Sequence, residues 1–361
     1  MTTTAKLTGV RARPLAVPMR RPLVTAGGAV TVAPLVLVDL ETDAGITGRS
    51  YVFTYTQAAL GPTAALIDGM FEWLRGEELA PAALEQRLQA RLRLLGAQGL
   101  AMLALSALDM AAWDAAARLA GRPLARLLGA GTATIPAYNS CGLGLIGAAA
   151  APLEAVALAR GFAAIKLRLG YPTLAEDLVV LRAVRGAVGP ATRIPVDYNQ
   201  SLSASEATVR ACALDGEGVE WIEEPTAFDD DEGHARIAAA VCTPVQIGEN
   251  WWGPGMMARS IAARACDVVM PDPGKIGGVS GWLRAAGLAA AHGLRMSSHL
   301  YPEISAHLLA VTPTAHWLEW VDWAEPVIKW PLALVDGHAV PGDEPGTGLE
   351  WNEDAIKRLA A

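Results

Sequence analysis

The stretch GFAAIKLRLG, residues 161–170, places two cations inside an apolar segment. Side chains alternate between the two faces of a β-strand, so Lys166 and Arg168 should point to one side, away from the leucines between and after them. Burying charge is costly unless an opposite charge lies within reach. The stretch therefore predicts a buried strand that forms one wall of an anion-binding site.

Seven further apolar runs accompany this one, and helical stretches separate most of them. In chain order the eight runs are TIPAY, AAIKLRL, RIPVDY, VEWIEEP, TPVQIGE, CDVVMPD, LRMSSH and HWLEW. They recur about every 20 to 30 residues, as strands of β/α units do. We predict an α/β fold with a (β/α)8-type barrel over residues 131–340, although a doubly wound parallel sheet would show a similar alternation.

Residues 1–130 follow a different pattern. The run APLVLVDLETDAGITGRSYV predicts two strands joined by a turn at residues 43–45. Residues 57–130 are helical in pattern, and GLAMLALSALDMAAWDAAARLAG is apolar on all sides, as a buried helix is. We predict a separate α+β domain here, and we expect residues 341–361, which follow the eighth β/α unit, to pack back on it.

Composition restricts the class of function. The chain has 361 residues, 52% of them hydrophobic, and a net charge of −8, which argues against a nucleic-acid partner. Charged residues, glycine or proline interrupt each apolar run before the ~18 residues of a membrane span. The four cysteines show no CxxC spacing, and the N-terminus lacks the apolar core of a signal peptide. We expect a cytoplasmic protein that contacts neither membrane nor nucleic acid.

Three carboxylates recur at the ends of successive strands. Asp197, Glu223 and Glu249 are each 26 residues apart, about one β/α unit, so they should lie side by side at the barrel mouth. Strand-end acids can also cap the following helices, but three at this spacing would repel one another without a cation. Oxygen ligands without His or Cys favour Mg²⁺.

His299 and Asp272 end neighbouring strands, where the carboxylate can orient the imidazole as a base. In an eight-stranded ring the second strand lies nearly across from the seventh, so Lys166 and Arg168 should face this pair. A substrate carboxylate held by metal and cation would present its α-carbon to the base, which predicts abstraction of a proton α to a carboxylate. If burial raises the pKa of Glu319, on the eighth strand, this residue would donate a hydrogen bond to that carboxylate.

These features resemble the enolase superfamily, and within it the mandelate racemase subgroup, over nearly the whole chain. The resemblance implies that residues 1–130 cap the barrel mouth with a substrate flap at residues 20–55, that Mg²⁺ is the cofactor, and that the protein is a homo-octamer acting on a small carboxylate. It is carried by the motifs PLVTAGGAVTVAPLVLVDL, IKLRLGYP, VDYNQSL, WIEEPT, GENWWGP, MPDPGKIGGVSGW, SSHLYPEISAHLLAVTPTAHWLE and PGTGLEW.

The resemblance also implies roles for single residues. The metal ligands would be Asp197, Glu223 and Glu249. The catalytic positions would be Lys166, which contacts the substrate carboxylate, Arg168, the base pair His299 and Asp272, and the electrophile Glu319. The substrate contacts would be Ser140, Asn199, Lys275, Val24 and Tyr55.

Arg168 departs from the family pattern. Racemases of this type carry a second lysine there, which is the base opposite the histidine, whereas arginine keeps its proton in nearly all proteins. A single base can still eliminate a β-hydroxyl group, as acid-sugar dehydratases of the subgroup do. The flap LVTAGGAV, however, suits an aromatic or aliphatic substrate. We predict racemisation of a 2-hydroxycarboxylate, with acid-sugar dehydration by His299 as the alternative and a catalytically silent homologue as a third possibility.

The run GLGLIG, residues 142–147, matches the GxGxxG pattern of dinucleotide-binding folds. Such a fold needs an acidic residue at the end of the next strand to hold the ribose. Lys166 and Arg168 occupy that place instead, so we interpret these glycines as loop residues.

Overall fold

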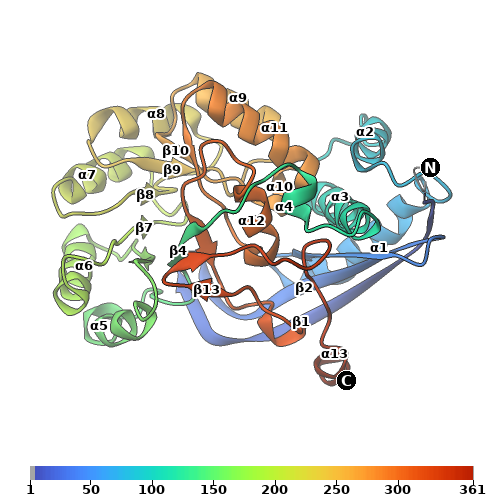
Figure 1. Cartoon of the computed structure of the whole chain (residues 1–361). Coiled ribbons are helices and arrows are strands. Elements are labelled where there is room, and N and C mark those ends of the chain that lie inside the picture. The colour runs from blue at the N-terminus through green and yellow to red at the C-terminus, as the bar shows by residue number, and fades with distance from the viewer. Residues whose placement is uncertain (1–4, 361) are drawn as a thin grey trace.

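The chain folds into a sheet domain and a barrel domain, seen in a computed structural model that describes residues 5–360 (Figure 1). The N-terminal sheet is antiparallel, with strand order β1-β2-β3: β1 (Leu7–Thr25), β2 (Gly28–Thr42) and β3 (Thr47–Phe53). The predicted turn follows Thr42, whose carbonyl accepts from the N–H of Gly45 at 3.1 Å. Helical elements follow: η1 (Gln57–Ala59), α1 (Leu60–Phe71), α2 (Pro81–Arg91), α3 (Gly99–Leu119) and α4 (Leu124–Leu127).

The eight predicted runs form the parallel strands of the barrel. Lys166 divides the second run into two short pieces. In order the strands are β4 (Ile135–Asn139), β5 (Ala164–Ile165) with β6 (Leu167–Arg168), β7 (Val196–Asp197), β8 (Ile222–Glu223), β9 (Val245–Ile247), β10 (Val268–Val269), β11 (Arg295–Met296) and β12 (Leu318–Trp320).

The strand pairing closes this ring. Six strands pair in the order β11-β10-β9-β8-β7-β6, and β4 pairs in parallel with both β5 and β12. A parallel bridge between Met296 and Ala315 connects β11 to the segment before β12. The predicted barrel is therefore confirmed, and the doubly wound sheet is excluded.

Helices cover the outside of the ring (Figure 1). Several begin with side-chain caps: Thr173 and Glu176 form a capping box, and Ser203 and Asp230 cap the next two helices. These caps fix where each strand-to-helix loop ends. The helices are α5 (Gly147–Leu158), α6 (Leu174–Val188), α7 (Ala204–Leu214), α8 (Asp231–Ala240), α9 (Pro254–Ala262), α10 (Pro273–Ile276), α11 (Gly278–Ala291) and α12 (Pro302–Leu309).

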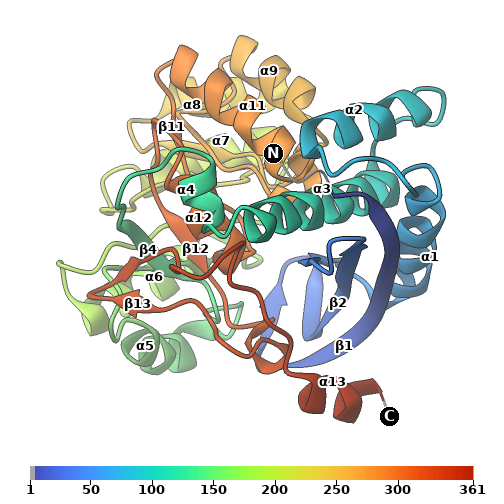
Figure 2. The same cartoon turned by 45° about the vertical axis from the view of Figure 1, so that its right-hand side comes forward.

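Helix α3 joins the two domains. It packs against β3 and α1 of the sheet domain and against α10 and α11 of the barrel, and Figure 2 shows it between them. Within residues 5–360 it is the one helix long and apolar enough to cross a membrane, but 83% of its apolar window is buried inside the protein. Such burial is that of a core helix, as the sequence pattern predicted.

The C-terminal residues return to the sheet domain. They form η2 (Glu325–Val327), β13 (Leu334–Val335), β14 (His338–Ala339) and α13 (Glu353–Ala360). The indole nitrogen of Trp351 donates to the buried Oδ1 of Asp39 on β2 at 2.7 Å. Arg13 on β1 bridges Asp39 and Glu353 at 2.9 and 2.8 Å. These contacts tie the C-terminal helix to the first two strands.

Two glycines of GLGLIG, Gly142 and Gly144, lie in the loop between β4 and α5 as interpreted, whereas Gly147 is the first residue of α5. Gly144 packs directly against the backbone of Val24, and a Cβ atom at Gly144 would collide with it. The N–H of Leu145 donates to the carbonyl of Val24 at 2.8 Å. Gly144 thus lets the end of β1 approach the barrel mouth.

Candidate active site

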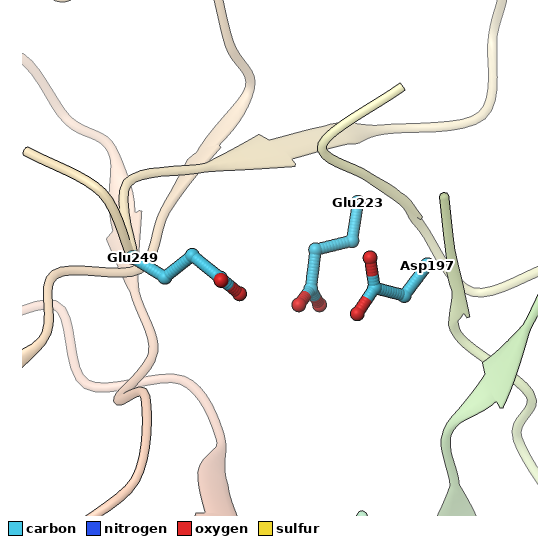
Figure 3. A group of neighbouring side chains, drawn as sticks. All are labelled: Asp197, Glu223 and Glu249. Carbon is cyan, nitrogen blue, oxygen red and sulfur yellow. The ribbon is translucent and has the colours of Figure 1, made fainter. Parts of the chain in front are cut away.

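Three buried carboxylates converge at the carboxyl ends of neighbouring strands. Asp197 ends β7, Glu223 ends β8, and Glu249 lies just beyond β9. One oxygen from each side chain lies within 4.8 Å of the others, and Figure 3 shows all three pointing toward one space. The structure thus brings together the metal ligands predicted from their spacing.

These residues fit a hard divalent cation. Oε2 of Glu249 is buried and accepts no hydrogen bond from the described residues. Burial, opposed by Lys166 and reinforced by Asp197 and Glu249, raises the pKa of Glu223 to about 8. An Mg²⁺ ion prefers oxygen ligands. At this site it would give the oxygen of Glu249 a partner and would offset the repulsion between the carboxylates.

Lys166 lies in the centre of this acidic group. Its Nζ lies 2.6 Å from Oε1 of Glu223, 2.9 Å from Oε1 of Glu319 and 3.1 Å from Oδ2 of Asp197. Burial disfavours its charge, but the three carboxylates outweigh burial and raise the pKa of Lys166. A lysine with a raised pKa keeps its proton, so Lys166 carries a positive charge into the site rather than acting as a base.

The condition set for Glu319, a raised pKa, is not met. Burial acts in that direction, but Lys166, His299 and the N–H of Leu300, which donates to Oε2 at 2.9 Å, together lower the pKa of Glu319 below its usual value. The sequence pattern placed Glu319 near the base but not Lys166 against it, so the dominant charge was missed.

His299 and Asp272 form the predicted pair. Nδ1 of His299 lies 2.6 Å from Oδ2 of Asp272, and a carboxylate only accepts, so Nδ1 carries a proton. Nε2 lies 3.4 Å from Oε2 of Glu249 and holds the lone pair when the ring is neutral. The other contacts of Asp272 are also donors: the Tyr55 hydroxyl at 3.1 Å and the N–H groups of Gly274 and Lys275 at 2.6 and 3.2 Å. Asp272 therefore fixes the imidazole while it caps α10.

A cavity of about 140 Å³ opens above these groups. Its size suits a small molecule rather than a drug-sized ligand. The apolar lining comes from the sheet domain and from two barrel loops: Leu23, Val30, Phe53, Tyr55, Leu300 and Trp323. The polar lining is Lys166, Arg168, Asp197, Asn199, Glu249, His299 and Glu319.

The predicted substrate contacts divide into two groups. Asn199 and Tyr55 line the cavity, and the buried Oδ1 of Asn199 accepts no hydrogen bond from the described residues. Ser140 and Lys275 do not line it: Ser140 Oγ accepts from Arg168, and Lys275 Nζ donates to Asn250 at 2.6 Å and lies 3.8 Å from the centre of the Tyr55 ring.

The prediction for Val24 is wrong by one residue. Leu23 lines the cavity and is buried, whereas Val24 is exposed. Consecutive side chains of β1 point to opposite faces, so the neighbour of a lining residue faces away. Val30 on the paired strand lines the cavity with Leu23, and the two residues are partners in the ladder.

Sequence patterns missed the remaining apolar lining. Phe53, Leu300 and Trp323 are separated along the chain and meet through domain packing. Backbone conformation gives one signal that the sequence lacks: Tyr55, Asn199 and Leu300 all have positive φ without being glycine. Such conformations cluster at functional sites.

Arg168 is buried, and two hydrogen bonds hold its guanidinium group in place. Nη1 donates to the carbonyl of Gly142 at 2.6 Å and Nη2 to Oγ of Ser140 at 2.9 Å, while Nε has no partner among the described residues. A guanidinium offers donors only. Arg168 therefore presents a fixed cation to the cavity on the side that the sequence placed opposite His299.

A larger cavity lies elsewhere. A cleft of about 940 Å³ separates the C-terminal segment from the turn after β2 and from α12. Its cations are already paired, since Arg49 and Arg118 both contact Glu350, at 2.6 and 2.9 Å. The smaller cavity is lined by the metal ligands Asp197 and Glu249 and by His299, and it also contains the unpartnered oxygen atoms of Asn199 and Glu249, so we assign the active site there.

Comparison with known families shows the family of this chain. Residues 8–129 match the mandelate racemase / muconate lactonizing enzyme N-terminal domain, and residues 148–355 match the enolase C-terminal domain-like family. The chain belongs to the mandelate racemase / muconate lactonizing enzyme subgroup of the enolase superfamily. The resemblance predicted from its motifs is confirmed.

Named relatives of this subgroup differ in chemistry. The chain is 44% identical, with a TM-score of 0.95, to a Bradyrhizobium enolase solved with magnesium and mandelic acid, and the alignment covers 99% of both chains. It is 37% identical over 263 residues to L-talarate/galactarate dehydratase of Salmonella typhimurium, spanning 72% of this chain and 66% of that protein. It is 30% identical to D-galactarolactone cycloisomerase of Agrobacterium fabrum, over 97% of this chain and 98% of that one.

Proposed function

We propose that this chain is a Mg²⁺-dependent enzyme that abstracts the α-proton of a 2-hydroxycarboxylate with a compact apolar group, of which mandelate is the first candidate. One observation carries the proposal: His299, whose Nε2 holds the lone pair when the ring is neutral, lines the cavity together with the metal ligands Asp197 and Glu249. The apolar lining and the mandelic acid in the Bradyrhizobium relative support the substrate class.

The ligands Asp197, Glu223 and Glu249 would hold the ion, which supplies a Lewis acid for the substrate carboxylate. Lys166 provides a second positive charge at the same carboxylate. His299 takes the α-proton on Nε2, and the C–H electrons move into the π system of the carboxylate. Asp272 stabilises the imidazolium formed, and the same nitrogen returns a proton to the α-carbon.

The test is proton NMR in D₂O with Mg²⁺ and each enantiomer of mandelate supplied separately. Loss of the α-proton signal from one enantiomer supports the proposal. A panel of acid sugars runs in parallel, because a β-hydroxyl would allow the same carbanion to lose water. Mandelate that exchanges no proton at saturating Mg²⁺ would contradict the substrate class, and loss of water from an acid sugar would establish the dehydratase alternative.

Arg168 favours single-base chemistry over the two-base racemisation expected from the family. Both of its terminal nitrogens are committed to Ser140 and Gly142, and none can accept a proton from carbon. We expect exchange without inversion in the natural protein. Arg168→Lys would place a titratable amine on this face and should add inversion of configuration. Polarimetry or chiral chromatography measures this inversion.

Arg168→Met is the matched control, because it supplies neither charge nor base. It should keep exchange on the His299 face, weaken substrate binding and give no inversion. Inversion by the natural protein at a rate close to its exchange rate would contradict the single-base interpretation and restore the racemase.

We also propose a cytoplasmic homo-octamer, as the family resemblance implies. All four cysteines are free thiols, which is compatible with a reducing compartment. Multi-angle light scattering of the purified protein measures the assembly.

A further inference from the structure

The metal ligand Glu223 is held by neutral donors from two adjacent strands. Its Oε2 accepts from the indole N–H of Trp221 at 3.0 Å and from Nε2 of Gln246 at 3.3 Å. Its other oxygen, Oε1, is the one that contacts Lys166. Trp221, Glu223 and Gln246 are all fully buried. The carboxylate is thus anchored on one oxygen, while the other faces the centre of the acidic group.

Gln246 is oriented in turn by a series of hydrogen bonds that runs from the buried Ser297 through the half-buried His316 to the exposed Arg295. Its Oε1 accepts from the hydroxyl of Ser297 at 3.0 Å, which leaves Nε2 to donate to Glu223. The Ser297 hydroxyl has one proton, so its second contact, Nδ1 of His316 at 3.1 Å, must donate to it. Nε2 of His316 then accepts from Arg295 at 3.2 Å.

The direction of these hydrogen bonds is set by Arg295, the member of the series farthest from Glu223. Arginine carries donors only, so Arg295 fixes the tautomer of His316, and each following hydrogen bond can run only toward Glu223. Burial and the cations Arg295 and Arg193 lower the pKa of His316 to about 4, which agrees with a neutral ring. The amide of Gln246 is therefore not free to rotate.

We propose that Gln246, oriented by Ser297 and His316, is a positioning residue of the metal site that presents Oε1 of Glu223 to the ion. The inference rests on the metal site of the proposed function. Partners of metal ligands generally fix ligand orientation, and losing one costs 10- to 100-fold in affinity. A hydrocarbon at position 246 would leave Oε2 with Trp221 alone and would leave the Ser297 hydroxyl without its acceptor.

The test is the Mg²⁺ dissociation constant of the full chain, measured calorimetrically without substrate. We expect Gln246→Leu to weaken Mg²⁺ binding about 10- to 100-fold. It should also lower the melting temperature in EDTA, because it leaves buried polar groups unpaired. Ser297→Ala, which frees the amide without removing it, should give a smaller loss, and it keeps the test valid if Gln246→Leu fails to fold.

Met270→Leu is the matched control. Its sulfur also contacts Nε2 of Gln246, at 3.0 Å, but lies off the path from His316 to Glu223. This variant should bind Mg²⁺ within about twofold of the natural protein. Equal affinities in Gln246→Leu, Ser297→Ala and the natural protein would overturn the positioning role alone, whereas a natural protein that binds no Mg²⁺ would overturn the proposed function.

Discussion

Replacing His299 by asparagine is expected to slow α-proton exchange by about 100- to 10,000-fold, the usual contribution of a positioned general base. Nδ1 of His299 donates to Asp272, so Nε2 holds the lone pair that takes the proton. The amide nitrogen of asparagine has no such lone pair. The measurement is the rate of α-deuterium incorporation into mandelate, with Mg²⁺ affinity determined on the same variant.

Mg²⁺ affinity should not fall, because His299 is not among the three ligands and its charged ring, 3.4 Å from Oε2 of Glu249, opposes a cation there. His292→Asn is the matched control: it makes the same substitution at an exposed residue at the end of α11 and should leave exchange unchanged. Full exchange activity in His299→Asn would exclude His299 as the base and would make another residue of the cavity responsible.

The same base sets the pH dependence. Burial opposes the charged imidazolium, but Glu249, Glu319 and Asp272 outweigh it and raise the pKa of His299 from 6.5 to about 9. The neutral ring is the base, so exchange should rise with pH up to this pKa and level off above it. A cation on Glu249 removes part of the shift, so we expect the midpoint between these two values. A rate that falls across that range would contradict this assignment.

The barrel and the metal ligands were predictable because both depend on local spacing. Each β/α unit brings the chain back to the same rim, so 26-residue steps put Asp197, Glu223 and Glu249 on adjacent strands. His299 and Asp272 followed from the same rule. Here periodicity along the chain translates directly into proximity in space.

The apolar half of the cavity was not predictable in the same way. Leu23, Val30 and Phe53 reach the site because the sheet domain docks on the barrel, a contact that no local pattern encodes. The error at Val24 has a local cause, since the flap motif defined the strand but not which of its faces is buried. A one-residue change of register reverses every side chain.

Polar contacts inside the barrel also escaped sequence analysis. Gln246 lies in an apolar run and offers no charge pattern, and its partners Ser297 and His316 belong to later strands. The lowered pKa of Glu319 was missed for a related reason. Its burial was foreseen, but the side chain of Lys166 reaches from the second strand to the eighth and stabilises the charged carboxylate. Such pairings depend on the closed ring and on side-chain length together.

Glu249→Gln is expected to weaken Mg²⁺ binding by at least about 100-fold, more than the loss of a residue that only supports a ligand. The substitution keeps the shape of the side chain but removes one of the three charges of the site. α-Proton exchange should fall in parallel and should be recovered only partly at high Mg²⁺. The pKa of His299 should also fall toward its usual value, because Glu249 is the largest charge that raises it.

Glu224→Gln is the control for this change. Glu224 is also buried and next to a ligand in sequence, but both of its oxygens accept from Asn250, at 2.9 and 3.0 Å, and it is not part of the metal-binding group. The natural protein and Glu224→Gln should gain about 2.7 kcal/mol of stability when Mg²⁺ is raised to 100 times its dissociation constant, and Glu249→Gln should gain almost none at that concentration. Equal stabilisation of all three proteins would mean that Mg²⁺ binds outside the Asp197, Glu223 and Glu249 group, and the chemistry proposed for the cavity would then lack its Lewis acid.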